Sequence, residues 1–216
     1  MSSFLSSLFG HTPQRVQAQE AIVGREDAIQ VHPTHLVLGT STLPPWEDKL
    51  DIIQLGMGCF WGAERKLWQQ SGVHSTQVGY AGGYTKNPTY KEVCTGRTDH
   101  TEVVRVVFDP TQISLAQILK VFLENHDPTQ GLRQGNDVGS QYRSAVYCYT
   151  PEQVAIVHQI LEEFQASLHS KGYGGITTEV RRDVEFFYAE DYHQQYLYKN
   201  PNGYCGLRGT GVECRI

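Results

Sequence analysis

The hydrophobic and polar positions after residue 50 follow the two periods of regular secondary structure. Runs rich in β-branched and aromatic residues predict five strands, at residues 51–57, 73–80, 101–108, 142–149 and 176–187. Apolar residues at helical spacing predict helices at residues 60–68 and 113–123, and a third that starts at Pro151 and ends at the glycines of residues 172–175. Thr150 would cap this third helix, and Gln153 would complete its capping box. One or two further helical turns are expected at residues 192–196.

The order of these elements predicts an α+β fold, in which helices cover a mixed β-sheet as a two-layer sandwich. A split β-α-β (ferredoxin-like) core is the topology that this order favours. Two long polar loops, residues 79–97 and 126–141, are expected to be active-site loops at one edge, since loops of this length are usually functional. A coiled, glycine-rich C-terminal tail follows at residues 200–216. Without an internal repeat or a second linker, residues 46–216 are expected to form one catalytic domain that includes this tail.

Residues 1–45 have no sustained periodicity and are expected to form an N-terminal extension that wraps the core and performs no chemistry. Prolines interrupt the pattern at positions 13, 33, 44 and 45, and residues 32–39 alone could form a short strand. The first ten residues contain an apolar patch but lack a basic start and a long apolar core. We therefore expect no secretory signal there.

Composition narrows the class of protein. The hydrophobic content of 39% and the charged content of 19% are those of a soluble globular chain. A net charge of −5 argues against nucleic acid or an anionic membrane as the main partner. No apolar run reaches the roughly 20 residues that span a bilayer. The five cysteines are odd in number and match no zinc spacing, so we expect thiols in the reducing cytoplasm and no metal.

Cys59 lies where the first predicted strand turns into the first predicted helix, between Gly58 and Gly62. The unpaired N–H groups and partial positive charge of a helix start stabilise a thiolate, so this position is expected to lower the cysteine pKa. Phe60 and Trp61 follow it directly. We predict that Cys59 is a nucleophile beside an apolar pocket; a buried, unreactive cysteine is the alternative.

Glu102 is the second residue of interest. It shares one face of its strand with three apolar residues, Val104, Val106 and Phe108. Burial at the end of this row would raise the Glu102 pKa and make it a proton donor near neutral pH. A strand-end glutamate turned towards water is the alternative.

Two further thiols, Cys205 and Cys214, lie in a tail segment that three glycines make mobile. A mobile tail can deliver one thiol to a distant sulfur and then pass the disulfide on. The remaining cysteines, Cys94 and Cys148, are expected to be idle.

The segment Gly58-Cys59-Phe60-Trp61-Gly62-Ala63-Glu64 resembles the signature of the A-type peptide methionine sulfoxide reductases. Further segments resemble the family pattern in order: Gly79-Tyr80-Ala81-Gly82-Gly83, Asn87-Pro88-Thr89-Tyr90, Glu92-Val93-Cys94, His100-Thr101-Glu102, Asn125-His126-Asp127-Pro128, Gly135-Asn136-Asp137-Val138-Gly139, Gln141-Tyr142-Arg143-Ser144 and Tyr188-Ala189-Glu190-Asp191-Tyr192-His193-Gln194-Gln195-Tyr196. The resemblance covers roughly residues 50–214.

This resemblance implies a role for each matching position. Cys59 would attack the sulfur of a methionine sulfoxide and become a sulfenic acid, while methionine is released. Glu102 would supply a proton, and the hydroxyl groups of Tyr90 and Tyr142 would hold the substrate oxygen. Binding of the substrate would fall to three other residues: Phe60 and Trp61 around its terminal methyl group, and Asp137 at its backbone.

The resemblance also implies how Cys59 is restored. Cys205 would attack the sulfenic acid, giving a disulfide and water, and Cys214 would then exchange into that disulfide. Thioredoxin would reduce the resulting Cys205–Cys214 disulfide, so no cofactor is expected beyond thioredoxin or a small dithiol. The expected substrates are the S epimer of methionine sulfoxide in oxidised proteins and as the free amino acid. We expect a monomer, because an enzyme that repairs many protein surfaces needs an open site.

Two departures from the family pattern bear on these roles. The turn before Glu102 often carries glycine in the family, whereas this chain has Asp99, and a second carboxylate there would raise the Glu102 pKa further. The spacing and number of tail cysteines also vary, so the order in which Cys205 and Cys214 act stays open.

Two other functions use the same residues differently. A thiol peroxidase or cysteine hydrolase would also use Cys59 as the nucleophile, and would need a base such as His100 or His193 beside it. Structural hydrogen bonding is the expected role of both histidines. A redox-sensing binder would recognise methionine side chains without turning them over.

Overall fold

The computed structural model describes residues 13–215. The first twelve residues of the expected N-terminal extension, and with them the expected lack of a secretory signal, lie outside the described residues, as does Ile216. None of the helices among the described residues combines the length and apolar character needed to cross a membrane.

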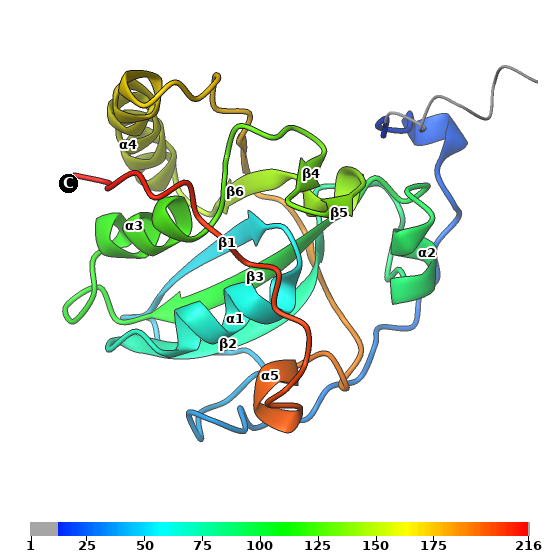
Figure 1. The fold of residues 1–216 in the computed structure, drawn as a ribbon. Coiled ribbons are helices and arrows are strands. Elements are labelled where there is room, and N and C mark those ends of the chain that lie inside the picture. The colour runs from blue at the N-terminus through cyan, green and yellow to red at the C-terminus, as the bar shows by residue number, and fades with distance from the viewer. Residues whose placement is uncertain (1–12, 216) are drawn as a thin grey trace, which may run out of the picture.

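A six-stranded sheet forms the centre of the molecule (Figure 1). Its strands are β1 (Asp51–Met57), β2 (Val73–Ala81), β3 (Thr101–Phe108), β6 (Ser144–Cys148), β7 (Glu179–Arg182) and β8 (Phe186–Tyr188). The order across the sheet is β7-β6-β1-β3-β2-β8, and β6–β7 is the one parallel pair. The sheet is therefore mixed, as expected. β1 and β2 lie on either side of β3, so the connection between them is a split β-α-β unit.

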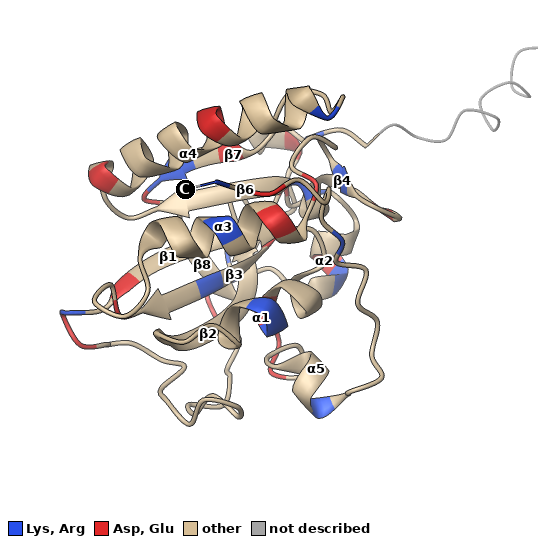
Figure 2. Ribbon diagram, turned by 60° about the vertical axis from the view of Figure 1, so that its left-hand side comes forward, with Lys and Arg blue, Asp and Glu red and all other residues tan. Residues whose placement is uncertain are grey.

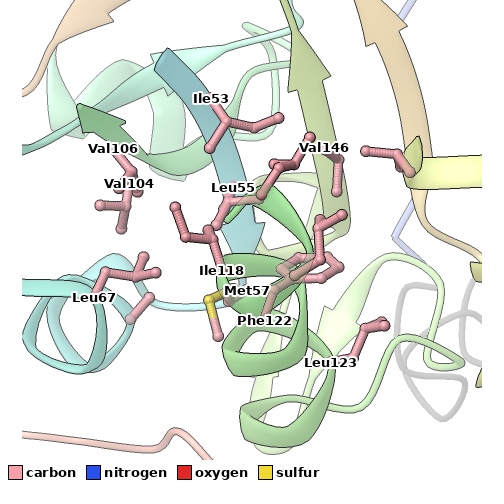
Figure 3. Packing of buried hydrophobic residues seen from close by; sticks show 14 of the residues in the cluster. Ile53, Leu55, Met57, Leu67, Val104, Val106, Ile118, Phe122, Leu123 and Val146 are labelled. Carbon is pink, nitrogen blue, oxygen red and sulfur yellow. The ribbon is translucent and has the colours of Figure 1, made fainter. Parts of the chain in front are cut away.

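Three helices pack against one face of this sheet: α1 (Phe60–Trp68), α3 (Leu115–Asn125) and α4 (Pro151–Ser170). Leu55 of β1 pairs with Val104 of β3, and both side chains are fully buried beneath the helices. Figure 3 shows Ile118 and Phe122 of α3 pointing into this layer. Figure 2 shows acidic and basic residues distributed over the helices and loops of the face in view.

The opposite face of the sheet is closed without a helix layer. Arg105 of β3 is buried there, and its Nε donates to Gln77 Oε1 at 2.8 Å. The guanidinium group lies 4.0 Å from the centre of the Phe186 ring and 4.8 Å from those of Trp46 and Tyr188. Aromatic rings thus cover the buried Arg105 cation on this face.

The last expected strand, residues 176–187, is wrong as a single element. The chain forms β7 and β8 at opposite edges of the sheet, and it reverses between them at Asp183, which has a positive φ of 57°. The expected strand at 142–149 also starts two residues later, because Ser140–Tyr142 forms a 3-10 turn.

Short elements occupy the segments expected to be loops. The first contains the helix α2 (Tyr90–Cys94), which is capped by Thr89 and Glu92. The second contains a hairpin of β4 (Arg133–Gln134) and β5 (Asp137–Val138). One or two helical turns are expected at residues 192–196. The helix there, α5 (Tyr196–Lys199), begins four residues after the expected start.

The expected capping box at the start of α4 is half formed. Thr150 accepts from the Gln153 backbone N–H at 3.2 Å. The Gln153 side chain, however, accepts from the Tyr149 N–H at 2.8 Å and donates to the Ile52 carbonyl at 3.0 Å. The glutamine therefore ties the helix to β1 instead of capping it.

Residues 13–45 run along the outside of the sheet and its loops (Figure 1). Arg15 pairs with the buried carboxylate of Asp99, and Arg25 pairs with Glu92 at the start of α2. The expected strand at residues 32–39 is wrong: this stretch is a turn, closed by an isolated bridge between Thr34 and Ser41.

Truncation of a core side chain measures how much the helical layer contributes to stability. Ile118→Ala, at a fully buried position of α3, should lower the free energy of unfolding by about 2–5 kcal/mol in urea denaturation. The matched control Ile156→Ala, at a position of α4 that is 39% exposed, should change it by less than about 0.5 kcal/mol. Equal effects at the two positions would contradict the packing described above.

Candidate active site

Six segments distant in sequence converge on one cavity of about 140 Å³. Its walls come from the start of α1, α2, β3, β5, the 3-10 turn and the C-terminal tail, and consist of Cys59, Phe60, Trp61, Tyr90, Glu102, Asp137, Tyr142 and Tyr204. Seven of these eight residues are expected from the sequence and the family resemblance; Tyr204 is the addition. The strands and helices that line the cavity do so near their ends, so the packed core of the protein positions the lining side chains.

Cys59 ends the turn between β1 and α1 and is the residue before the first helical residue. Gly58 makes this turn possible. Its φ is +85°, and a Cβ built on it would lie 2.6 Å from the Gln134 side chain. The thiol is partly buried and faces the cavity.

The expected lowering of the Cys59 pKa is wrong. Burial and the neighbouring Glu102 carboxylate raise the pKa of this thiol well above its usual range, and the Trp61 backbone N–H opposes them only in part. The helix start does act in the expected direction, but desolvation outweighs it. The raised pKa therefore favours the thiol form of Cys59 at neutral pH.

Glu102 is 1% exposed and lies on the same face of β3 as Val104, as expected. One carboxyl oxygen, Oε2, accepts from the Phe60 backbone N–H at 3.1 Å. The other, Oε1, is buried without a hydrogen-bond partner among residues 13–215. Burial raises the pKa of Glu102 to about 8, so the carboxyl group keeps its proton at neutral pH.

The second carboxylate that raises the Glu102 pKa is Asp137, not Asp99. Asp99 is itself buried, but Arg15 donates to both of its oxygens, at 2.6 to 3.1 Å. This pairing neutralises Asp99, so the hypothesis that it acts on Glu102 is wrong.

Two tyrosine side chains line the same cavity. Tyr90 is the first residue of α2, and its backbone N–H donates to Glu190 Oε1 at 2.9 Å. Tyr142 is the last residue of the 3-10 turn. Burial raises the pKa of both Tyr90 and Tyr142, so each hydroxyl stays protonated and can donate to an oxygen in the cavity.

Phe60 and Trp61 form the apolar wall. The Trp61 ring stacks on Tyr196 with 3.9 Å between ring centres, and its Nε1 donates to His193 Nδ1 at 3.0 Å. His193 is 1% exposed, and burial lowers its pKa to about 4, so it is neutral. No local pattern links His193 with Trp61, because the two residues are 132 positions apart.

Neither histidine is engaged as the base of a cysteine hydrolase. The ring nitrogens of His100 bond to the Gly83 N–H at 3.1 Å and to the Thr85 carbonyl at 2.7 Å. His193 bonds to Trp61. Both histidines therefore have the structural role that we expected.

The two tail thiols occupy different surroundings. Cys205 is exposed, and its Sγ lies 2.8 Å from a Cβ built on Gly62 of α1. Cys214 is 2% exposed, and its backbone N–H donates to Glu124 of α3 at 2.9 Å. Burial and Glu124 raise the Cys214 pKa to about 11. The structure thus brings Cys205, but not Cys214, to the helix that carries Cys59.

Comparisons with known proteins agree on one family. The family model described as peptide methionine sulfoxide reductase matches residues 51–213. The peptide methionine sulfoxide reductase MsrA of Rhodospirillum centenum is 58% identical over 199 residues, which are 92% of this chain and 91% of the relative. The methionine sulfoxide reductase A of Corynebacterium diphtheriae superposes with a TM-score of 0.85 at 46% identity, covering 94% of this chain and 99% of that one.

A third similarity concerns a complex. Mxr1 from Saccharomyces cerevisiae, in a crystal structure with Trx2, superposes with a TM-score of 0.51 at 25% identity, covering 74% of this chain and 93% of that one. The matched family model covers the whole region that builds the cavity, from the strand before Cys59 to the tail after Cys205. This chain belongs to the peptide methionine sulfoxide reductase family.

Proposed function

We propose that this chain reduces the S epimer of methionine sulfoxide, in oxidised proteins and as the free amino acid, to methionine. One observation carries the proposal. A thiol, a protonated carboxyl group with one oxygen unpaired among residues 13–215, and two tyrosine side chains line one cavity with an apolar wall. A sulfoxide needs this combination, because its sulfur accepts a nucleophile only as its oxygen accepts protons.

The reaction follows from the position of these groups. The sulfur of Cys59 attacks the sulfoxide sulfur while Glu102 donates a proton to the oxygen, and Tyr90 and Tyr142 hydrogen-bond the same oxygen. The S–O bond of the substrate breaks as the oxygen transfers to the Cys59 sulfur as a hydroxyl group, and the bond between the two sulfurs breaks as methionine leaves. The thiol proton of Cys59 replaces the proton that Glu102 donated. The sulfoxide is reduced by two electrons to methionine, and the Cys59 thiol is oxidised to a sulfenic acid.

Substrate binding uses the other walls of the cavity. Phe60 and Trp61 hold the terminal methyl group, since the stack on Tyr196 and the bond to His193 keep the indole ring in place. Asp137 faces the same space from the β4–β5 hairpin and accepts a hydrogen bond from the substrate backbone.

Regeneration uses the tail. Cys205 attacks the sulfenic acid, forming the Cys59–Cys205 disulfide and releasing water. Cys214 then exchanges into this disulfide, for which residues 209–214 must leave their contacts with α3 and α4. Thioredoxin reduces the Cys205–Cys214 disulfide; the complex of Mxr1 with Trx2 supports this partner.

Three features of the proposal derive from the sequence. The chemistry needs no cofactor beyond the electrons of thioredoxin or a small dithiol. The protein acts as a monomer, with a site open to many surfaces. Its location is the cytoplasm, where the thiols are kept reduced.

The activity and the role of Glu102 are tested together with the two enantiomers of methyl p-tolyl sulfoxide, using dithiothreitol as the reductant. The protein should form sulfide from one enantiomer. Glu102→Gln should lower the single-turnover rate by roughly 10²–10⁴-fold, because the amide can still accept from Phe60 but supplies no acidic proton. Glu64→Gln, at an equally buried carboxyl group of α1 outside the cavity, should cost much less. No sulfide from either enantiomer would refute the proposed function.

The raised pKa of Glu102 also predicts how stability depends on pH. Its folded-state pKa of about 8 exceeds the ordinary value of 4.5. Between these two pH values the folded chain keeps a proton that the unfolded chain releases, so the free energy of unfolding should fall as pH rises. Glu102→Gln should show a shallower fall in urea denaturation from pH 5 to 8. Identical slopes would contradict a raised pKa.

The order of the tail thiols predicts which reductants a variant can use. With thioredoxin as the sole reductant, Cys214→Ser should lose most of its turnover, because the disulfide stays between Cys59 and Cys205. With dithiothreitol, which is small enough to reach that disulfide, turnover should be retained. Sulfide formation is measured in both assays, and full thioredoxin-driven turnover would remove Cys214 from the relay.

A further inference from the structure

Tyr204, the residue before Cys205, connects the tail to the cavity. Its hydroxyl donates to the two carboxylate oxygens of Asp137, at 3.3 and 3.4 Å. The Tyr204 side chain is otherwise 49% exposed, so this bond is its main anchor. Desolvation and Asp137 raise the pKa of Tyr204, which keeps the hydroxyl protonated and able to donate.

The backbone on both sides of Cys205 is shaped around this anchor. A Cβ built on Gly206 would lie 2.2 Å from the Tyr204 hydroxyl, so a side chain at this position would displace the tyrosine ring. On α1, a Cβ built on Gly62 would lie 2.8 Å from Cys205 Sγ and 3.0 Å from Leu207 Cβ. The Tyr204 bond and the contact with Gly62 therefore bracket the thiol.

This bracket places Cys205 over the start of α1. Gly62 lies three residues after Cys59, which makes the two positions neighbours on one side of the helix. The Cys205 thiol thus lies within the electrostatic range of Cys59, whose pKa it helps to raise. When Tyr204 is bound to Asp137, the tail holds Cys205 against Gly62 of α1, three positions after Cys59.

The same bond stands in the way of a substrate. Tyr204 and Asp137 both line the cavity beside Cys59. A substrate that fills the cavity and hydrogen-bonds Asp137 competes with the tyrosine for the space beside this carboxylate. The carboxylate is therefore shared between two occupants, the substrate and the tail.

We propose that Tyr204 is a positioning residue for regeneration: its hydroxyl takes over Asp137 when methionine leaves, and this returns Cys205 to Cys59. The inference rests on the proposed function. In the step that it assists, the Cys205 sulfur bonds to the Cys59 sulfur, the S–O bond of the sulfenic acid breaks, and the hydroxyl group leaves with the thiol proton as water. The Asp137 carboxylate then binds the substrate during reduction and the Tyr204 hydroxyl during regeneration.

Tyr204→Phe separates the two steps. A hydrogen bond to a charged group is worth enough to change an equilibrium by roughly tenfold. Without the hydroxyl, the sulfenic acid on Cys59 should persist roughly tenfold longer, and the KM for methionine sulfoxide should fall. The yield of methionine in a single turnover should stay at one equivalent, because the groups that reduce the sulfoxide are untouched.

The experiment mixes reduced protein with no more than one equivalent of free methionine sulfoxide in the absence of reductant, so that each Cys59 reacts at most once. Methionine is measured by chromatography, and the sulfenic acid is trapped with dimedone at successive times and measured by intact mass. Tyr198→Phe, which alters a tyrosine of α5 that is 56% exposed, is the matched control and should behave as the unaltered protein. A merely structural loss at Tyr204 would lower the methionine yield as well.

The possible results separate a failure of this inference from a failure of the proposed function on which it rests. An unchanged sulfenic acid lifetime in Tyr204→Phe, with a normal methionine yield, overturns the inference and leaves the proposed function in place. No methionine from the unaltered protein refutes the proposed function itself. A longer lifetime with a full methionine yield supports the inference.

Discussion

The backbone N–H of Phe60 donates to Glu102 across the gap between α1 and β3, and the active site is assembled around this bond. It joins the first turn of α1, which carries Cys59, to the central strand next to β1. The bond also leaves one carboxyl oxygen free for the substrate. Tyr90, Tyr142 and the apolar wall can act on a substrate only because Cys59 and Glu102 are held in place.

Desolvation determines whether Cys59 and Glu102 keep their protons at neutral pH. The burial that makes Glu102 an acid near neutral pH also keeps Cys59 protonated, since charges on both would repel each other in a medium of low polarity. The helix start has few free donors. One N–H serves Glu102 and another serves Cys59, so its stabilising effect is divided between two acids. The substrate therefore meets a thiol and an acid that both hold protons.

The sequence predicts the elements whose pattern is long and regular. β1, α1 and β3 have the bounds expected from periodicity alone, because their apolar faces are wholly buried. The pattern fails at residues 176–187, where β-branched and aromatic residues resume directly after a reversal that a single aspartate makes possible. α2 and the β4–β5 hairpin are too short to produce a period.

The active site is predictable from the sequence to about the same extent as the fold. The position of Cys59 and the burial of Glu102 follow from local sequence, and the other walls of the cavity follow from the family pattern. The sign of the Cys59 pKa shift does not follow from local sequence, because it depends on how much solvent the distant loops exclude from the cavity. The link of Tyr204 to Asp137 spans 67 positions and leaves no local trace.

The seat of the tail on α3 and α4 has a consequence for redox potential. Val212 and Cys214 are buried there, and the Tyr173 hydroxyl donates to the Thr210 carbonyl at 2.8 Å. Formation of a Cys205–Cys214 disulfide must give up this packing, so the packing stabilises the dithiol and not the disulfide. By linkage, the couple becomes more oxidising than the same two thiols would be on an unanchored tail. The packed tail thus adds driving force to the transfer of electrons from thioredoxin.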